Sequence, residues 1–373
     1  MPWKEETSMS LKTRFIKRAL TKKEPFSQLC TEFNISRKTG YQLLNRYESE
    51  GLKGLAPRSR RPHTSPLKTD PGLEEKILRV RDDNPTWGAR KIKRYLHNEG
   101  YHTLPSPSTI TNILKRHGMI SIEESLKRQA LIRFEREAPN ELWQMDFKGH
   151  FQLLSRQRCY PLTIVDDHSR FSLAIRACQN EQARSVKTQL TGIFKRYGIP
   201  QQINVDNGQP WGSSCLTPYT HLAVWLMRLG IKVTHSRPRH PQTNVNCERF
   251  HRTLKQDLIL RQPIRNYAHA QTLFTRWREH YNYKRPHEAI DFDVPATRYK
   301  KSQHSMPKQL MPIEYPVGVI LRKVRGNGQI SYRNQNYLVG EAFKGHYVRI
   351  LENPDEASFD ILFNQFKVYS YDL

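Results

Sequence analysis

The alternation of apolar and polar positions divides the chain into a helical N-terminal third, a mixed centre and a strand-rich C-terminal part. Between Ser10 and Gly51, apolar residues recur at helical spacing in three short groups. A tight turn at Asn34-Ile35-Ser36 precedes the third group, where Ser36 is placed to cap a helix and Gly51 to end it. The pattern therefore predicts a helix-turn-helix DNA-binding domain over residues 1–52.

The third predicted helix of this domain has a polar face that its apolar stripe leaves free. Side chains of these types reach phosphates and base edges in a DNA major groove. The same pattern also fits a small helical interaction module with a solvated face. The predicted DNA contacts on this face are Arg37, Lys38, Tyr41, Gln42 and Asn45.

A basic segment follows, and then a second helical pattern. The run Ala56-Pro-Arg-Ser-Arg-Arg-Pro-His cannot form a packed element, so residues 53–70 are predicted to be a linker that lies along a DNA groove through Arg58, Arg60 and Arg61. Residues 71–119 predict a second helix-turn-helix-like DNA-binding domain, with Trp87 in its core. Residues 120–138 predict a charged linker helix. The predicted DNA contacts of the second domain are Arg90, Lys91, Lys93 and Arg94.

After Pro139 the period of the pattern changes from that of helices to that of strands. Strands are predicted at residues 142–149, near Phe151, and at 160–166, 171–177, 202–206 and 232–235. Helices are predicted at 181–197, at 219–229 and from about 245 onward. Several strands before the first helix, followed by alternation, predict a ribonuclease-H-like α/β domain with a helical extension over residues 139–303.

The C-terminal part begins with a proline-rich linker at residues 304–316. Five short strand patterns follow within residues 317–373, separated by turns at Gly326-Asn-Gly and Asn353-Pro-Asp. They predict a small β-barrel of the SH3-like kind. The expected fold class is thus multidomain: all-α DNA-binding modules, a central α/β core and a terminal β-barrel.

Three acids stand out against this background. Asp146 and Asp206 each close an apolar, strand-like run, whereas Glu248 lies near the start of a helical pattern. A compact fold can bring the three carboxylates together, and such a group suits a hard divalent cation that keeps waters for substrate phosphates. Asp166 and Asp167 lie beside Ser169, where turn or capping roles are expected instead.

Composition narrows the choice of partner. The formal net charge of +26 and a pI near 10 indicate a polyanion such as nucleic acid, bound tightly at low salt, although a basic surface without a dedicated partner has the same composition. Five cysteines without a CxxC pair predict reduced core thiols and no zinc site. No apolar run approaches the roughly 20 residues of a membrane span, and the polar start is not a signal peptide. A cytoplasmic, nucleoid-associated protein is expected.

The chain resembles integrase-core insertion-sequence transposases, which are relatives of retroviral integrases and carry an Asp, Asp, Glu triad. The resemblance extends over nearly the whole length, and the order and number of its motifs make it specific. The motifs are Ile35-Ser-Arg-Lys-Thr-Gly-Tyr, Arg58-Ser-Arg-Arg-Pro-His, Pro85-Thr-Trp-Gly-Ala-Arg-Lys-Ile, Asn140-Glu-Leu-Trp-Gln-Met-Asp-Phe-Lys-Gly, Val165-Asp-Asp-His-Ser-Arg-Phe, Val205-Asp-Asn-Gly, His240-Pro-Gln-Thr, Glu248-Arg-Phe-His-Arg-Thr-Leu-Lys and Tyr281-Asn-Tyr-Lys-Arg-Pro-His-Glu-Ala.

The resemblance implies that Asp146, Asp206 and Glu248 are the catalytic residues and the metal ligands. The implied cofactor is a pair of Mg²⁺ ions per active site, with Mn²⁺ as a substitute. The implied activity is binding of the terminal inverted repeats of an insertion sequence, followed by DNA strand cleavage and strand transfer. The expected partners are double-stranded DNA and further copies of the chain, at least as a dimer, with neither a membrane nor a small-molecule substrate.

The helix of Glu248 carries two further basic candidates. Arg252 and Lys255, at i+4 and i+7, lie on the face of the catalytic acid and are expected to hold the phosphates of the DNA end. An ion pair between Glu248 and Arg252 is the alternative.

The chain departs from the family pattern at two places. Val245 and Asn246 stand where the family usually has Gly and Lys, which predicts a stiffer loop and a weaker grip on DNA. Residues 209–220 lengthen the interval between Asp206 and Glu248, with Trp211 as the expected anchor. The first departure supports one alternative function, a catalytically impaired DNA-binding repressor derived from a transposase. A hydrolytic nuclease of the same fold is another alternative.

Overall fold

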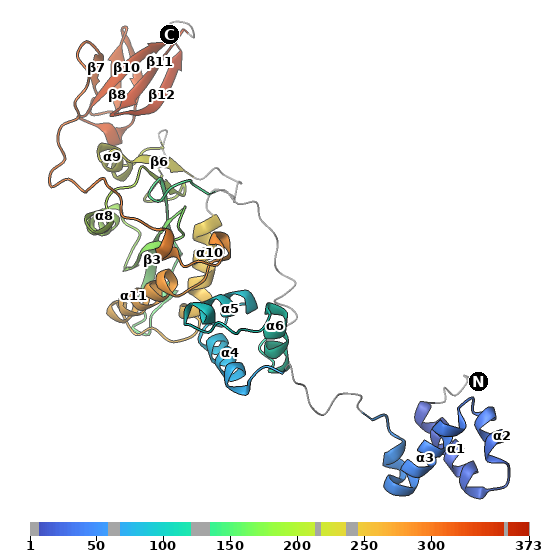
Figure 1. Cartoon of the computed structure of the whole chain (residues 1–373). Coiled ribbons are helices and arrows are strands. Elements are labelled where there is room, and N and C mark those ends of the chain that lie inside the picture. The colour runs from blue at the N-terminus through green and yellow to red at the C-terminus, as the bar shows by residue number, and fades with distance from the viewer. Residues whose placement is uncertain are drawn as a thin grey trace. The chain divides into compact units, whose positions relative to one another are not determined.

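The computed structural model describes residues 7–58, 68–120, 135–212, 218–235, 245–353 and 357–372. The chain forms two compact units, Met1–Lys68 and Thr69–Leu373 (Figure 1). Several sequence predictions lie outside the described residues: the DNA contacts at Arg60 and Arg61, most of the linker helix at 120–138, the turn after Asn353, and the thiol of Cys215.

The N-terminal unit consists of three α-helices, α1 (Ser8–Thr21), α2 (Phe26–Glu32) and α3 (Arg37–Glu50), and a short 3₁₀ helix, η1 (Gly51–Leu55). The side chain of Ser36 accepts a hydrogen bond from the backbone N–H of Thr39 and so caps α3. Gly51, with φ of 62°, ends the helix in a conformation that glycine adopts without strain. The predicted helix-turn-helix arrangement is confirmed.

Gly40 lies where α3 approaches α1 and α2 most closely. A Cβ atom at this position would lie 2.7 Å from Cys30 Sγ and 3.1 Å from the rings of Phe15 and Phe26. We expect Gly40→Ala to destabilise the N-terminal unit by about 1–3 kcal/mol, because added volume in a packed core forces side chains from their rotamers. Faster hydrogen exchange of the α1–α3 amides would show this.

The matched control is Gly192→Ala on α8 (Ala183–Tyr197), where the new Cβ meets nothing within 4 Å. This substitution should leave exchange in the N-terminal unit unchanged. Equal exchange in the two variants would contradict the packing of α3 described above.

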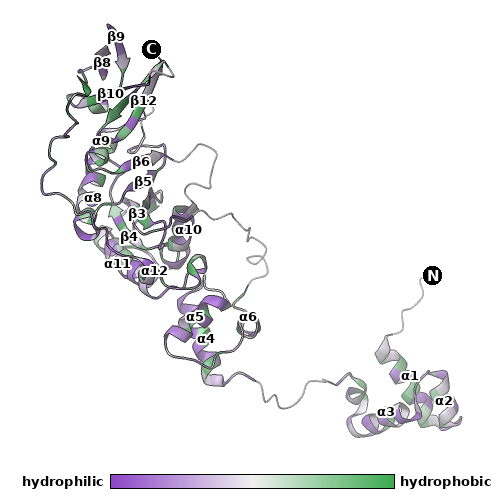
Figure 2. Cartoon of the chain, turned by 45° about the horizontal axis from the view of Figure 1, so that its top comes forward, coloured by the Kyte–Doolittle hydropathy of each residue, from purple (hydrophilic) through white to green (hydrophobic). Residues whose placement is uncertain are grey.

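The second helical module contains α4 (Pro71–Asp83), α5 (Ala89–Asn98) and α6 (Pro107–Arg116). The side chains of Asp70 and Ser106 cap α4 and α6. Trp87 is fully buried at the centre of the module, which confirms its predicted core role. Hydrophilic residues predominate along α5 (Figure 2).

The central sheet has the mixed topology that the order of elements predicted. Its six strands are β1 (Leu142–Phe147), β2 (Phe151–Gln152), β3 (Arg158–Asp166), β4 (Ser172–Cys178), β5 (Gln202–Val205) and β6 (Lys232–His235). The order is β2-β3-β1-β5-β6, with β4 also paired to β3. Strand β1 is antiparallel to β3 and parallel to β5, and β5 is parallel to β6. Strand β1 therefore lies at the centre of the sheet.

Helices cover both faces of this sheet. One face packs on α8 and α9 (His221–Arg228) through a core that includes Trp143 and Met145 of β1. The other face packs on α10 (Val245–Leu254) and α11 (Tyr267–Tyr283). Because side chains alternate along a strand, Gln144 and Asp146 lie on the face of α10. Trp211 is buried in the first of these cores, as its predicted anchoring role requires.

The second helical module contacts the helical extension of the core. This extension continues from α10 through a π-helical segment, η3 (Lys255–Ile259), to α11, a 3₁₀ turn, η4 (Glu288–Ile290), and a short helix, α12 (Pro295–Arg298). Thr86 donates to Asp257 Oδ1 at 2.9 Å, and Arg285 Nη1 lies 3.0 Å from Asp257 Oδ2. The ring of Trp87 stacks on His280 at 5.6 Å. Within Thr69–Leu373, the module is thus joined to the core by polar and aromatic contacts.

The C-terminal part is an open all-β module rather than the predicted closed barrel, which is not confirmed. Its strands are β7 (Ile320–Lys323), β8 (Gln329–Tyr332), β9 (Gln335–Leu338), β10 (Tyr347–Asn353), β11 (Ser358–Phe363) and β12 (Phe366–Asp372), with the 3₁₀ turn η5 (Glu341–Phe343). Four strands form a sheet in the order β12-β11-β10-β7, and β8 pairs only with β9. Val224 and Met227 of α9 enter the core of the module. A helix of the neighbouring domain therefore contributes to the apolar core of the module.

Two predictions from composition can be compared with the described residues. Cys30, Cys159, Cys178 and Cys247 are free and buried, as predicted. Across the described segments, no helix combines the length and the apolar composition that a bilayer span requires.

Candidate active site

Strands β1 and β5 bring Asp146 and Asp206 side by side. The parallel register pairs Gln144 with Asn204, and continuing it by two residues places Asp146 level with Asp206, just beyond the end of β5. Asp146 lies two residues after Gln144, and Asp206 lies two residues after Asn204. Because side chains alternate along a strand, the two acids lie on the same face of the sheet as this pair. Neighbouring strands are about 4.8 Å apart, so the two carboxylates approach each other at the carboxyl ends of parallel strands.

The electrostatics of the site confirm this proximity. Burial, together with the negative charges of Asp206, Glu181 and Glu248, raises the pKa of Asp146 to about 7. Burial also raises the pKa of Asp206. In the part of the chain that the structure describes, no Lys or Arg lies within 4.0 Å of the Asp146 carboxylate, and the one basic contact is His251 at 3.9 Å. The site therefore concentrates negative charge that a cation would stabilise.

Glu248 lies in the first turn of α10 and is exposed. Phe250 and Leu254 pack this helix onto the sheet, and the charge of Glu248 contributes to the raised pKa of Asp146. Within the described residues, however, no group of three or more His, Cys, Asp or Glu side chains is close enough to hold a metal ion. The three acids thus share one region of the fold, but they do not form a preassembled three-ligand site.

Glu181 is a fourth acid of this region, which the sequence motifs did not indicate. It follows β4, which is parallel to β1 because both strands are antiparallel to β3. Its position therefore lies at the same edge of the sheet as Asp146 and Asp206. Burial and then the charge of Asp206 raise the pKa of Glu181. The topology of the sheet, once known, is the signal that would have found it.

His251 is a second residue that sequence reasoning missed, although it lies one helical turn after Glu248. Its Nε2 is 2.7 Å from Thr163 Oγ1, and the Thr163 hydroxyl donates to the backbone carbonyl of Asp146 at 3.0 Å. Because that hydroxyl proton is already used, Nε2 of His251 must donate, which leaves Nδ1 as an acceptor 3.9 Å from Asp146 Oδ2. Burial, reinforced by the charge of Lys148, lowers the pKa of His251 to about 3, so the imidazole is neutral.

The predicted basic residues of α10 and its π-helical continuation are exposed. Arg252 forms no ion pair with Glu248 within the described segments, so the proposed i,i+4 pair is not formed. Burial lowers the pKa of Lys148, and the nearby charge of Lys255 lowers it further. Lys148, two residues after Asp146 on the same side of the strand, therefore lies close to Lys255 beside the acids.

The predicted DNA contacts of the N-terminal unit form one exposed face of α3. Tyr41 is also exposed, and its ring stacks on Phe26 with centroids 4.3 Å apart. Arg58, which follows α3 and η1, forms an ion pair with Glu50, the last residue of α3. The exposed residues of this face are Arg37, Lys38, Tyr41, Gln42 and Asn45.

In the second helical module, the predicted contacts on α5 lie next to the core. Arg94 Nη2 is 2.6 Å from Asp293 Oδ1, and Arg90 Nη1 is 3.7 Å from Glu288 Oε1. The charge of Lys91 contributes to the lowered pKa of His287, whose main cause is burial, whereas Lys93 is half-buried. Helix α6 instead presents an exposed stripe of Ser108, Asn112 and Lys115.

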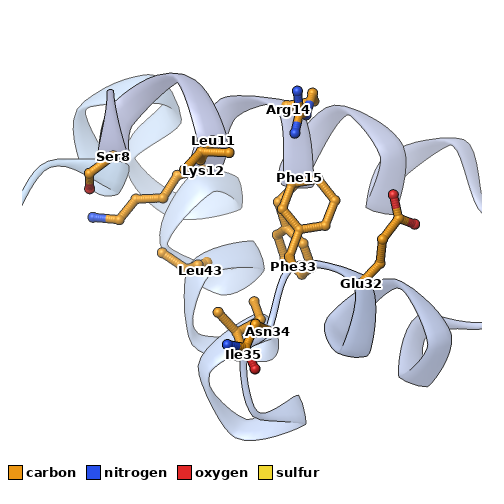
Figure 3. Close-up of a pocket in the computed structure, with 10 residues that line it drawn as sticks. All are labelled: Ser8, Leu11, Lys12, Arg14, Phe15, Glu32, Phe33, Asn34, Ile35 and Leu43. Carbon is orange, nitrogen blue, oxygen red and sulfur yellow. The ribbon is translucent and has the colours of Figure 1, made fainter. Parts of the chain in front are cut away.

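A pocket of about 360 Å³ lies in the N-terminal unit rather than beside the acids (Figure 3). It is bordered by α1 and by the turn before α3, and Phe15, Phe33 and Leu43 supply part of its lining. The pocket is thus a hollow beside the helix-turn-helix core, and none of the predicted metal ligands lines it.

Comparison with known protein families agrees with this organisation. Two integrase core domain models match residues 136–241 and 229–295. A helix-turn-helix domain model matches residues 11–63, and a homeodomain-like domain model matches residues 39–114.

Among similar curated proteins, an uncharacterized 31.7 kDa protein of the insertion element IS407 from Burkholderia multivorans is 24% identical over 60% of this chain and 79% of its own length. The transposase of IS904 from Lactococcus lactis is 27% identical over 60% of this chain and 91% of its own length. The Gag-Pol polyprotein of Walleye dermal sarcoma virus is 26% identical over 48% of this chain and 10% of its own length.

Among solved structures, the HTLV-2 integrase catalytic core domain in complex with magnesium shares 16% identity. It covers 44% of this chain and 99% of its own, with a TM-score of 0.35. A simian T-cell lymphotropic virus intasome chain, also 16% identical, covers 76% of this chain and 91% of its own, with a TM-score of 0.38.

Proposed function

We propose that this chain, which carries an integrase core and is related to insertion-sequence transposases, binds the terminal inverted repeats of an insertion sequence and catalyses DNA strand cleavage and strand transfer. The observation that carries the proposal is the pair of acids, Asp146 and Asp206, that two parallel strands bring together at one edge of the sheet. The charge of Glu248, in the first turn of α10, contributes to the raised pKa of Asp146, which supports Glu248 as the third acid. Phosphoryl transfer needs such a site, because charge on the phosphate must be neutralised while the reacting oxygens are held in line.

The side chains present fit a hard divalent cation. Asp146, Asp206 and Glu248 would hold it through oxygen atoms, and burial together with neighbouring negative charge raises the pKa of Asp146. Two Mg²⁺ ions, or Mn²⁺ in their place, would supply the positive charge that phosphoryl transfer requires. The neutral His251 donates a hydrogen bond to the Thr163 hydroxyl, which in turn donates to the backbone carbonyl of Asp146 and helps to hold its position.

The basic surface serves DNA binding in this proposal. The exposed face of α3 would read bases in a major groove, and Arg58, Arg60 and Arg61 would contact phosphates of the same DNA. Because three basic residues of α5 lie beside the core, we assign the reading face of the second module to α6. Arg252, Lys255 and the neighbouring Lys148 would contact phosphates of the DNA end. Joining two element ends requires both in one complex, so the active form is at least a dimer.

A strand-transfer assay with Mg²⁺ and terminal-repeat DNA tests this function. We expect a joined product of element end and target DNA, formed only when the divalent ion is present. Binding of the repeat without any joined product would instead support a DNA-binding repressor. Cut ends without joined strands would support a hydrolytic nuclease.

The α3 face gives a separate prediction for DNA recognition. We expect Gln42→Ala and Asn45→Ala to weaken binding of the terminal repeat by about 1–3 kcal/mol each, since each removes a potential base contact. Lys38→Ala should weaken binding to all sequences alike and reduce the salt slope by about 1. Fluorescence anisotropy over a range of salt concentrations measures both effects.

Lys195→Ala on α8 is the control, because it removes one exposed positive charge outside the proposed DNA-binding faces. Equal losses for Gln42→Ala on the terminal repeat and on random DNA would rule out base reading by this residue.

A further inference from the structure

We propose that Gln144, Asp167 and Asn246 form a positioning network that sets the start of α10, and with it Glu248, against the Asp146 strand. This inference rests on the function proposed above and adds a group of residues to its machinery. None of the three is a proposed metal ligand. They act through the backbone of α10 rather than on the reacting atoms.

Gln144 is the member of the network on β1, two residues before Asp146 and on the same face of the sheet. Its side chain is buried. Oε1 accepts a hydrogen bond from the backbone N–H of Cys247 at 3.3 Å, and Nε2 donates to Asp167 Oδ1 at 2.8 Å. The N–H groups of a first helical turn have no partner within the helix, so Gln144 supplies one from the strand of the catalytic acid.

Asp167 is the centre of the network and lies in the turn between β3 and β4. Its Oδ1 accepts from Asn246 Nδ2 at 2.6 Å and from Arg170 Nη1 at 3.3 Å, in addition to Gln144. Its Oδ2 accepts from the backbone N–H of Arg136 at 3.0 Å. The Asp167 side chain is only 5% exposed. A buried carboxylate with this many donors is held rigidly, and its charge near the start of α10 is favourable to the helix dipole.

These hydrogen bonds hold the first turn of α10, whereas hydrophobic packing holds the middle and the end of the helix. Phe250 and Leu254 hold the helix against the sheet, but apolar contacts permit small rotations and shifts along the axis. Asn246 and Cys247 are tied to two different elements, and Glu248 is the next residue. In the described part of the chain, no hydrogen bond or ion pair to the Glu248 side chain itself is present. Its position therefore depends on where the backbone is held.

The network changes the meaning of the departure at residues 245 and 246. The sequence pattern predicted that Asn246 weakens the site, because it replaces a cation that could touch DNA. Its amide instead donates a hydrogen bond to Asp167. Asn246 therefore has a structural role, which a residue in a decayed site would not need. This hydrogen bond argues against decay of the site at this position.

The test uses the full-length chain and the variants Asn246→Leu, which keeps the side-chain size without a donor, and Asn246→Asp, which places a carboxylate against Asp167. Loss of such a supporting contact typically lowers metal affinity or activity by about 10–100-fold. We expect a loss of this size in the single-turnover joining rate at saturating DNA. Terminal-repeat affinity should stay at the wild-type value, which a general folding defect would not allow.

Two readouts that do not depend on joining complete the design. Hydrogen exchange of the first-turn amides of α10 should become faster in both variants. Mn²⁺ affinity, measured by calorimetry without DNA, should fall. If the wild type forms joined product and both variants match it in rate, exchange and Mn²⁺ affinity, the network has no positioning role while the proposed function stands. If the wild type forms no joined product, the proposed function fails, and exchange and Mn²⁺ affinity alone decide on the network.

Discussion

Replacing Asp146 or Asp206 by asparagine is expected to abolish strand joining while leaving terminal-repeat binding intact. Each substitution removes a negative charge and an oxygen of the proposed metal site from the edge of the sheet where β1 and β5 meet. A cation in such a site contributes several kcal/mol of transition-state stabilisation, which corresponds to a loss of about 10³-fold or more. Glu248→Gln is expected to have an effect of the same size. Gel-based joining assays measure the loss, and anisotropy with labelled repeat DNA measures binding.

The raised pKa of Asp146 allows a test of whether Asp146→Asn loses strand joining through a change of charge rather than through unfolding. In the folded chain this pKa is raised to about 7 from the ordinary value of 3.8. Between pH 3.8 and about 7, the Asp146 carboxyl is protonated in the folded protein but ionised in the unfolded chain. It therefore contributes stability at low pH, and this contribution is lost as the pH rises toward 7. With EDTA present, Asp146→Asn should therefore melt at a higher temperature than the wild type above pH 7, and the difference should vanish near pH 4.

Glu279→Gln is the matched control for the triad variants, because it removes one exposed carboxylate from α11. It should change neither joining nor the pH dependence of melting. If Asp146→Asn retained the wild-type joining rate, or if it lost repeat binding together with joining, a catalytic role for this carboxylate could not be maintained.

The proximity of Asp146 and Asp206, the proposed catalytic pair, could be predicted from sequence because its signal is local. Asp146 and Asp206 each end an apolar run, and the carboxyl ends of parallel strands meet at one edge of an α/β sheet. Glu181 has no such signal. Glu181 follows β4. This strand is parallel to β1 only because both strands pair antiparallel with β3. Knowledge of the pairing, which the chain does not display locally, was needed to place it.

The positioning network shows the same limit at longer range. Asp167 was predicted to serve a turn or a cap, and its carboxylate accepts hydrogen bonds in the turn between β3 and β4. Its partner Asn246, however, lies 79 residues further along the chain. The predicted C-terminal barrel is not confirmed, and Val224 and Met227 of α9, from the preceding domain, are part of the core of the C-terminal module. Patterns of apolar residues identify a buried face, but they do not show which element covers it.

The second large effect is expected where the second helical module meets the core. Arg285 and Asp257 form an ion pair whose side chains are only 7% and 12% exposed, and Thr86 bonds to the same carboxylate. Removing one partner of such a pair leaves an uncompensated buried charge, at a cost of about 3–5 kcal/mol. We expect Asp257→Ala to release the module from the core. Proteolysis and hydrogen exchange of α4 and α5 would detect the release.

The same interface supplies a matched control in an exposed ion pair. Lys284 Nζ lies 2.9 Å from Glu99 Oε1, and both side chains face solvent. Screening by water limits such pairs to about 0–1 kcal/mol, so Glu99→Gln should leave the module attached. Equal release in the two variants would mean that contact number, not buried charge, holds the interface.

A double variant separates the energy of the buried charge from the loss of its contacts. Apolar residues of similar volume can often replace both members of a buried ion pair at little cost, because two desolvation penalties disappear together. Asp257→Leu with Arg285→Met should therefore hold the module more firmly than Asp257→Ala alone. If attachment is restored, the uncompensated charge rather than the lost contacts accounts for the release in Asp257→Ala. If the double variant is as loose as the single one, the hydrogen bond from Thr86 and the directionality of the pair hold the interface.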